Sequence, residues 1–216
     1  MIDPLEEARA AIAAASGAII GAEIAPAEID CPAQGCSARC AAPLRLGRDA
    51  GDLAAALQKT PVLLENRPLV QTVEAEGGHL LFSFTDAFFD TALNRMLLEL
   101  PRTPEPGPVL FEDAARARAA YTARRMWMLA RKAAGEPRCP ENPAVRQALL
   151  LTLAVPERLT HPRGLKLRML AASDALLCMT RSVLPRERPA LSIQSAHVAE
   201  LAARVFSLAL NTLYPN

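Results

Sequence analysis

The stretch between Asp113 and Glu136 carries the residue types best suited to binding chemistry, and residues 114–135 contain no acidic residue. Plotted as a helix at about 100° per residue, the stretch has one apolar face built mostly of alanine, leucine and methionine. The candidate ligand-binding side chains away from this face are Arg118, Tyr121, Arg125, Trp127 and Lys132. Because no acid within the helix pairs with these cations, the surface suits phosphate contacts and base stacking. A solvated charged face without a ligand would show the same pattern.

Three cysteines lie close together with the spacing C-x4-C-x3-C, namely Cys31, Cys36 and Cys40. A structural zinc site normally takes four ligands, commonly as two closely spaced pairs, and no histidine is near these three cysteines in the sequence. The chain opens with Asp3 and Glu6 rather than with the basic residues of an export signal, which argues against a disulfide framework. We therefore expect reduced, partly buried thiols, no metal and no cofactor.

Motifs that would identify a catalytic site are missing from the sequence. It contains no G-x-S-x-G turn, no GxxxxGK[ST] phosphate loop, no G-x-G-x-x-G fingerprint and no HExxH helix. The three histidines, His79, His161 and His197, lie in different regions of the chain. We therefore expect that the chain alone is not an enzyme. No segment approaches the roughly 18 to 20 apolar residues of a membrane span, so we also expect a cytoplasmic protein without membrane contact.

Charge and proline content divide the chain into two domains. Residues 1–105 hold 8 Lys and Arg against 15 Asp and Glu, a net charge of −7, whereas residues 106–216 hold 16 against 8, a net charge of +8. Four prolines fall within residues 101–108, which predicts a stiff, extended connector. The expected organisation is a domain over 1–100, a linker over 101–108 and a domain over 109–216, and the basic second domain suits an acidic partner.

Local signals predict an α+β fold: a small first domain of helices with a short antiparallel hairpin, followed by an all-helical bundle. Asp3-Pro4 is a helix start, and Gly77-Gly78 is the turn of a hairpin over 69–85 whose Leu80, Phe82 and Phe84 alternate onto one face. The other helices predicted in the first domain cover 37–46, begin at Asp49, and cover 86–100. Those of the second domain cover 111–134, 142–155, 162–185 and 192–213, in the pattern of a bundle.

The second domain resembles the DALR anticodon-binding domain of arginyl-tRNA synthetases. Val109 to Ala133 is similar to the opening helix of that domain, with Tyr121 and Arg125 at the family's Tyr and Arg and Ala123 where the family has His. Three later segments are similar to its following helices: Ala148–Glu157, Leu165–Thr180 and Ala196–Leu213. The first domain resembles the additional N-terminal domain of the same synthetases, through Ser37–Leu46, Asp52–Leu57 and Val70–Phe84.

The synthetases carry a Rossmann-type catalytic domain between these two parts, with HIGH-like and KMSKS-like signatures, and this chain has neither signature. The resemblance therefore implies a free-standing, non-catalytic tRNA-binding module whose partner is tRNA, with tRNA-Arg as the candidate. In that module Tyr121 or Trp127 would stack on bases, while Arg118, Arg125 and Lys132 would hold phosphates. Two alternatives stay open. The chain could be an adaptor that docks on a synthetase or tRNA-modification enzyme, or an accessory subunit of a split arginyl-tRNA synthetase.

Overall fold

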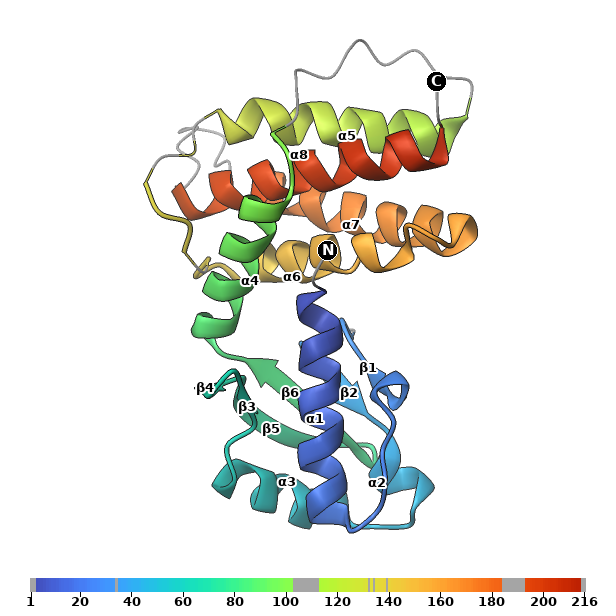
Figure 1. The fold of residues 1–216 in the computed structure, drawn as a ribbon, viewed down its shortest axis with the longest axis vertical. Helices are drawn as coiled ribbons and strands as arrows, with labels where there is room; N and C mark the ends of the chain where they lie inside the picture. Colours follow the sequence, from blue (N-terminus) through green and yellow to red (C-terminus); the bar gives the residue numbers. More distant parts are fainter. Residues whose placement is uncertain are drawn as a thin grey trace. The chain divides into compact units, whose positions relative to one another are not determined.

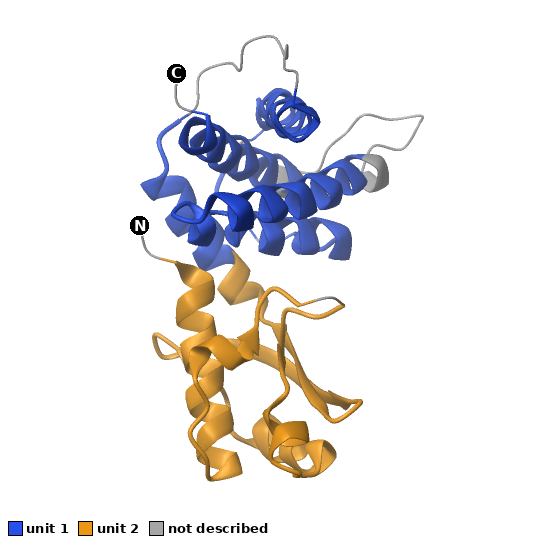
Figure 2. Cartoon of the chain, turned by 90° about the vertical axis from the view of Figure 1, so that its right-hand side faces the viewer, with its two compact units in different colours: residues 1, 90–216 blue, residues 2–89 orange. Residues whose placement is uncertain are grey.

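The computed structural model describes residues 3–33, 35–102, 113–131, 133, 135–138, 140–183 and 193–214, without the side chains of 181–183 and 193–194. The fold is α+β, as predicted. The chain divides into two compact units, which we call the amino-terminal unit (residues 2–89) and the helical unit (residues 90–216) (Figure 2). No helix of the described ranges combines the length and apolarity needed to cross a membrane.

A four-stranded antiparallel sheet forms the centre of the amino-terminal unit, with the strand order β1-β2-β6-β5 (Figure 1). Its strands are β1 (Ile29–Asp30), β2 (Ala38–Cys40), β5 (Val70–Glu76) and β6 (His79–Phe84). The predicted hairpin is confirmed, since β5 and β6 pair across Gly77-Gly78. Leu80, Phe82 and Phe84 of β6 are 0%, 0% and 2% exposed, so the predicted alternation buries this face. A separate two-stranded sheet joins β3 (Leu63–Leu64) to β4 (Arg67–Pro68).

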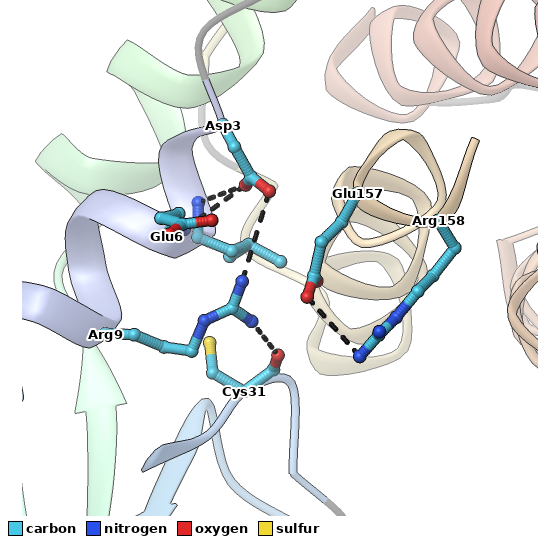
Figure 3. Close-up of polar contacts among 7 residues, drawn as sticks. Asp3, Glu6, Arg9, Cys31, Glu157 and Arg158 are labelled. Carbon is cyan, nitrogen blue, oxygen red and sulfur yellow. Dashed lines mark hydrogen bonds and ion pairs between the residues drawn. The ribbon is translucent and has the colours of Figure 1, made fainter. Parts of the chain in front are cut away.

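Helix α1 (Pro4–Ile20) begins at the predicted signal, Asp3-Pro4. The Asp3 carboxylate accepts from the Leu5 and Glu6 amides at 2.9 and 3.2 Å, and Gly21 ends the helix with a left-handed φ of 74°. The buried Arg9 guanidinium donates to the Cys31 carbonyl at 3.0 Å and lies 4.0 Å from Asp3 (Figure 3). These contacts tie α1 to the loop after β1. The shorter helices of this unit are the 3-10 turn Pro26–Glu28, α2 (Ala42–Arg45) and α3 (Ala50–Lys59).

The helix predicted over 37–46 is wrong for its first half, which forms strand β2. Ala38 and Cys40 are buried and Arg39 is exposed, an alternation with the period of a strand. β2 pairs with β1 on one side and with β6 on the other, so both its backbone edges find partners within the sheet. These non-local hydrogen bonds outweigh the local helix preference of the segment, and only α2 remains helical.

Helix α4 (Asp86–Glu99) begins in the amino-terminal unit and ends in the helical unit, because the two units divide between Phe89 and Asp90. Phe88 and Phe89 pack against Phe84, with ring centroids 4.6 and 6.4 Å away. The carbonyls near the end of α4 instead accept hydrogen bonds from Arg204. The division thus lies before the predicted linker at 101–108, of which residues 103–108 are outside the described ranges.

The four helices predicted for the second half are all present: α5 (Ala114–Ala130), α6 (Pro143–Leu153), α7 (Pro162–Val183) and α8 (Ile193–Leu213). A 3-10 turn, Pro156–Arg158, separates α6 from α7. Helix α5 lies along α8 (Figure 1) and also contacts α7. From Ser195 to Phe206, α8 is buried on all sides except at Glu200, which is half-buried. A helix that is apolar around most of its circumference is a core helix, so α8 is the centre on which the other helices pack.

Candidate nucleic-acid interface

Helix α5 carries the predicted interface, and its orientation is the one that the apolar pattern predicts. The Asp113 carboxylate caps the helix by accepting from the Ala115 and Arg116 amides at 2.8 and 3.3 Å. The buried residues of the helix are Ala119, Ala120, Thr122, Ala123 and Met126. Because these residues face α7 and α8, the opposite side of α5 is left for solvent.

The outer side of α5 presents four neighbouring side chains that we call the α5 ridge: Tyr121, Arg124, Arg125 and Met128. Tyr121 is 51% exposed and Met128 is 49% exposed. Arg124 is exposed and Arg125 is half-buried. In the described part of the chain neither arginine belongs to an ion pair. Arg124 therefore joins Tyr121 and Arg125 as a candidate ligand-binding residue.

Arg118 differs from the ridge arginines because it pairs with an acid. Its guanidinium forms an ion pair with Asp174 of α7, and the two side chains are 44% and 62% exposed. The sequence shows that α5 contains no acid to neutralise its cations, but it does not show that α7 supplies one. An exposed pair of this kind contributes at most about 1 kcal/mol, so the ion pair binds the Arg118 guanidinium only weakly.

Trp127 lies on a different flank of α5 from Tyr121. The two residues are six positions apart, which places their side chains about 120° apart around the helix axis. The Trp127 ring is half-buried, and the Arg131 guanidinium lies over it, 5.6 Å from the centroid. Trp127 and Arg131 are four positions apart, a spacing that places two residues on the same side of a helix.

A pocket of about 340 Å³ opens beside Trp127, and we call it the Trp127 pocket. Its lining residues are Arg102, Trp127, Ala130, Arg131, Ala133, Glu200, Ala203 and Arg204. Arg102, Glu200 and Arg204 are not among the site residues predicted from the sequence. The one available signal is that Glu200 and Arg204 are oppositely charged and four positions apart in a segment with no other Asp, Glu, Lys or Arg from 193 to 213. Lys132, the last predicted site residue, lies outside the described ranges.

A second cluster of charges, at the start of α5, serves the fold. The Tyr214 hydroxyl donates to Asp113 Oδ2 at 2.9 Å, and the Arg116 guanidinium lies 4.4 Å from the Tyr214 ring centroid. Lys166 Nζ lies 3.5 Å from the same Asp113 oxygen. The hydrogen bond from Tyr214 is the main cause that lowers the pKa of Asp113 below its ordinary value of 3.8. These contacts fasten the end of α8 to α5 and α7, so Arg116 and Lys166 are engaged within the protein.

The cysteines of the amino-terminal unit are packed thiols. Cys31 and Cys40 are buried, and Cys36 is half-buried and donates to the Ala38 carbonyl at 3.2 Å. Burial raises the pKa of the Cys36 and Cys40 thiols above the ordinary value of 9.0. The described residues contain no group of three or more side chains arranged to hold a metal ion.

The structure thus separates the predicted site into parts with different surroundings. Tyr121 and Arg125 share the α5 ridge, Arg118 lies beside it in an ion pair, and Trp127 belongs to the pocket. In comparisons with known proteins, no protein-family model, no curated protein and no solved structure matches this chain. The similarity to arginyl-tRNA synthetases therefore remains a prediction from the residues quoted above.

Proposed function

We propose that the helical unit binds tRNA through the α5 ridge and that the protein is a non-catalytic, cytoplasmic tRNA-binding module. The observation that carries the proposal is the exposed Tyr121 ring beside Arg124 and Arg125, two cations without an ion pair in the described part of the chain. Arginine binds phosphate oxygens through its planar set of donors. An exposed phenol ring offers a surface on which a base can stack.

The dimensions of the ridge agree with a short nucleic-acid segment. From Tyr121 to Met128 the helix rises by about 10 Å, which is enough to contact on the order of two successive phosphates of one strand. A base can stack on Tyr121 only if it has left its own helical stack, as bases in RNA loops do. The ridge therefore suits a loop of a folded RNA better than a continuous duplex.

Arg118 can add to this binding, although it is paired in the free protein. Its partner Asp174 is 62% exposed, so the pair is screened by water and salt. A phosphate that approaches the ridge can replace the Asp174 carboxylate as the partner of Arg118. We therefore expect Asp174→Asn to strengthen binding modestly, because it releases the guanidinium and removes a repelling charge.

Fluorescence anisotropy with labelled tRNA tests the proposal at several salt concentrations. The double variant Arg124→Gln/Arg125→Gln should bind more weakly, and its slope of log K against log salt should be smaller by about 1.4 to 1.8. Arg138→Gln, which removes an exposed arginine outside the ridge, is the matched control and should bind as the native protein does. Absence of tRNA binding by the native protein at about 50 mM salt would overturn the proposal.

A protein partner is the second candidate, because tyrosine, methionine and arginine are also enriched at protein interfaces. The exposure of Met128, which has no evident role toward phosphate, favours this alternative. The partner would be a synthetase or a tRNA-modification enzyme with an acidic docking surface. Affinity capture with and without ribonuclease separates the two candidates: a partner that remains after ribonuclease treatment and is lost in Arg124→Gln/Arg125→Gln supports the adaptor.

A further inference from the structure

The Trp127 pocket is a second binding site whose chemistry differs from that of the α5 ridge. Its volume of about 340 Å³ lies at the lower end of the range of small-ligand pockets, about 300 to 1,000 Å³. It is built by residues of the helical unit that are far apart in sequence: Arg102 after α4, Trp127 and Arg131 on α5, and Glu200 and Arg204 on α8. It lies on the flank of α5 that the ridge does not use.

The polar groups of the pocket divide into those that the fold occupies and those that remain for a ligand. Arg204 donates to the Leu97 and Leu100 carbonyls at 2.6 and 2.7 Å and also to Glu200 Oε1. Its donors are therefore engaged in structural contacts. Within the described ranges Glu200 Oε2 has no partner, so one carboxylate oxygen is left to accept a hydrogen bond.

Two arginines and one aromatic surface complete the set of groups left for a ligand. Arg102 is exposed and forms no ion pair with any described residue, and Arg131 is exposed with its guanidinium over the Trp127 ring. The Glu200–Arg204 pair is internally neutral, so Arg102 and Arg131 give the pocket a net charge of about +2. The pocket thus offers an indole for stacking, a carboxylate oxygen and two guanidinium groups, a combination suited to a planar heterocycle that carries a phosphate.

Among the four bases, guanine matches this set best. Its O6 and N7 atoms are adjacent acceptors that arginine binds in a bidentate manner. Its N1–H and N2–H groups are adjacent donors, one for the free Glu200 Oε2 and one for the acceptor site that Arg204 leaves open on Glu200 Oε1. Adenine, cytosine and uracil each place an acceptor beside their donor, and a carboxylate repels that acceptor. One arginine can bind the guanine edge while the other holds the phosphate.

We propose that the Trp127 pocket binds a guanine nucleotide, either as a free guanosine phosphate or as an unstacked guanine within RNA. The inference rests on the proposed function only for the RNA-bound form, because a free nucleotide needs no contact with the α5 ridge. Trp127 holds the base by stacking, Arg131 binds the O6 and N7 edge, Glu200 selects guanine, and Arg102 binds the phosphate.

Trp127 is the only tryptophan in the sequence, so its fluorescence reports directly on the pocket. We titrate the full-length protein with GMP, AMP, CMP and UMP at low salt and follow the Trp127 fluorescence. GMP should quench it at concentrations about tenfold or more below those that the other three nucleotides require, as expected for one bidentate base contact. Equal affinity for all four nucleotides, or no quenching by GMP up to millimolar concentration, would overturn the inference.

Variants test the assigned roles. Glu200→Gln should remove the preference for GMP over AMP, and Arg102→Gln should weaken GMP while leaving guanosine unchanged, since guanosine has no phosphate. Arg138→Gln is the control and should change neither. If Glu200→Gln does not fold, Arg102→Gln still tests the inference, because Arg102 is exposed and lies outside the helices. An unchanged ratio of GMP affinity to guanosine affinity in Arg102→Gln contradicts the assignment of Arg102 to the phosphate.

Oligonucleotides distinguish the two sources of the ligand. A uridine strand with one guanosine that binds at least tenfold more tightly than GMP identifies RNA as the source, whereas equal or tighter binding of GMP identifies the free nucleotide. Failure of the pocket assignment and failure of the proposed tRNA binding give different results. Loss of guanine selectivity with intact, salt-dependent tRNA binding defeats only the pocket assignment, and GMP binding without tRNA binding defeats only the proposed function.

Discussion

Replacement of Arg204 by methionine should destabilise the helical unit strongly. Arg204 is 8% exposed and donates to the Leu97 carbonyl in the last turn of α4 and to the Leu100 carbonyl just after it. Carbonyls at the end of a helix have no partner within that helix. Each hydrogen bond to a charged group contributes about 1.5–3 kcal/mol. Loss of both also leaves Glu200 without its partner, but Glu200 is 26% exposed and water compensates it in part. We therefore expect Arg204→Met to lower the free energy of unfolding by about 3–5 kcal/mol.

Urea unfolding followed by Trp127 fluorescence measures this effect in the helical unit alone, because the amino-terminal unit contains no tryptophan. Arg204→Lys keeps the charge but lacks the planar fork of donors, so an intermediate loss is expected. Arg138→Met, at an exposed position, should change the free energy by no more than about 0.5 kcal/mol. A loss below about 1 kcal/mol in Arg204→Met, or an equal loss in Arg138→Met, would refute the assignment of Arg204 as the residue that holds the end of α4.

Three further predictions concern the fold. Tyr214→Phe removes the hydrogen bond that lowers the pKa of Asp113, and the stabilisation from that bond is present above the ordinary carboxyl pKa of 3.8 and is lost as the pH falls through the lowered value. The acid-unfolding midpoint of the variant, followed by Trp127 fluorescence, should therefore move to higher pH. An unchanged midpoint contradicts this prediction. Burial raises the pKa of the Cys36 and Cys40 thiols, so the amino-terminal unit should lose stability as the pH rises above 9.0. Urea unfolding followed by circular dichroism at several pH values measures this loss. The variant Cys36→Ala/Cys40→Ala should lack the pH dependence. Phe82→Ala should cost about 3–5 kcal/mol of unfolding free energy in the same assay, because Phe82 is fully buried; a loss near zero would show that β6 does not anchor the core.

Features set by neighbouring residues could be predicted from the sequence. The starts of α1, α3 and α6 follow from Asp3, Asp49 and Asn142, whose side chains accept from amides two or three residues later. The β5–β6 hairpin follows from Gly77-Gly78, both of which have positive φ, between two alternating runs. The apolar face of α5 follows from helical spacing alone. In each case the residues that decide the structure lie within a few positions of one another.

Features set by distant residues could not be predicted. Strand β2 exists because its backbone pairs with β6, and the Ser37 hydroxyl accepts from an amide 47 positions away. The two units divide within α4 because Arg204, more than 100 positions later, binds the end of that helix. The partner of Arg118 likewise comes from another helix, α7. Local patterns contain no information about such partners, which depend on how the helices and strands pack.

The two proposals assign affinity and selectivity to different flanks of α5. The ridge offers Arg124 and Arg125 beside an exposed ring, so the proposed contacts with phosphate should weaken with salt and should not depend on base identity. The Trp127 pocket offers a carboxylate and a partly enclosed indole, so the proposed preference among bases should come from hydrogen bonds that salt affects little. Because the flanks are about 120° apart on a rigid helix, a ridge variant should change the salt slope and leave the order of base preference intact. The pocket variant Glu200→Gln should do the reverse, and a ridge variant or Glu200→Gln that changed both would show that the two surfaces form one site.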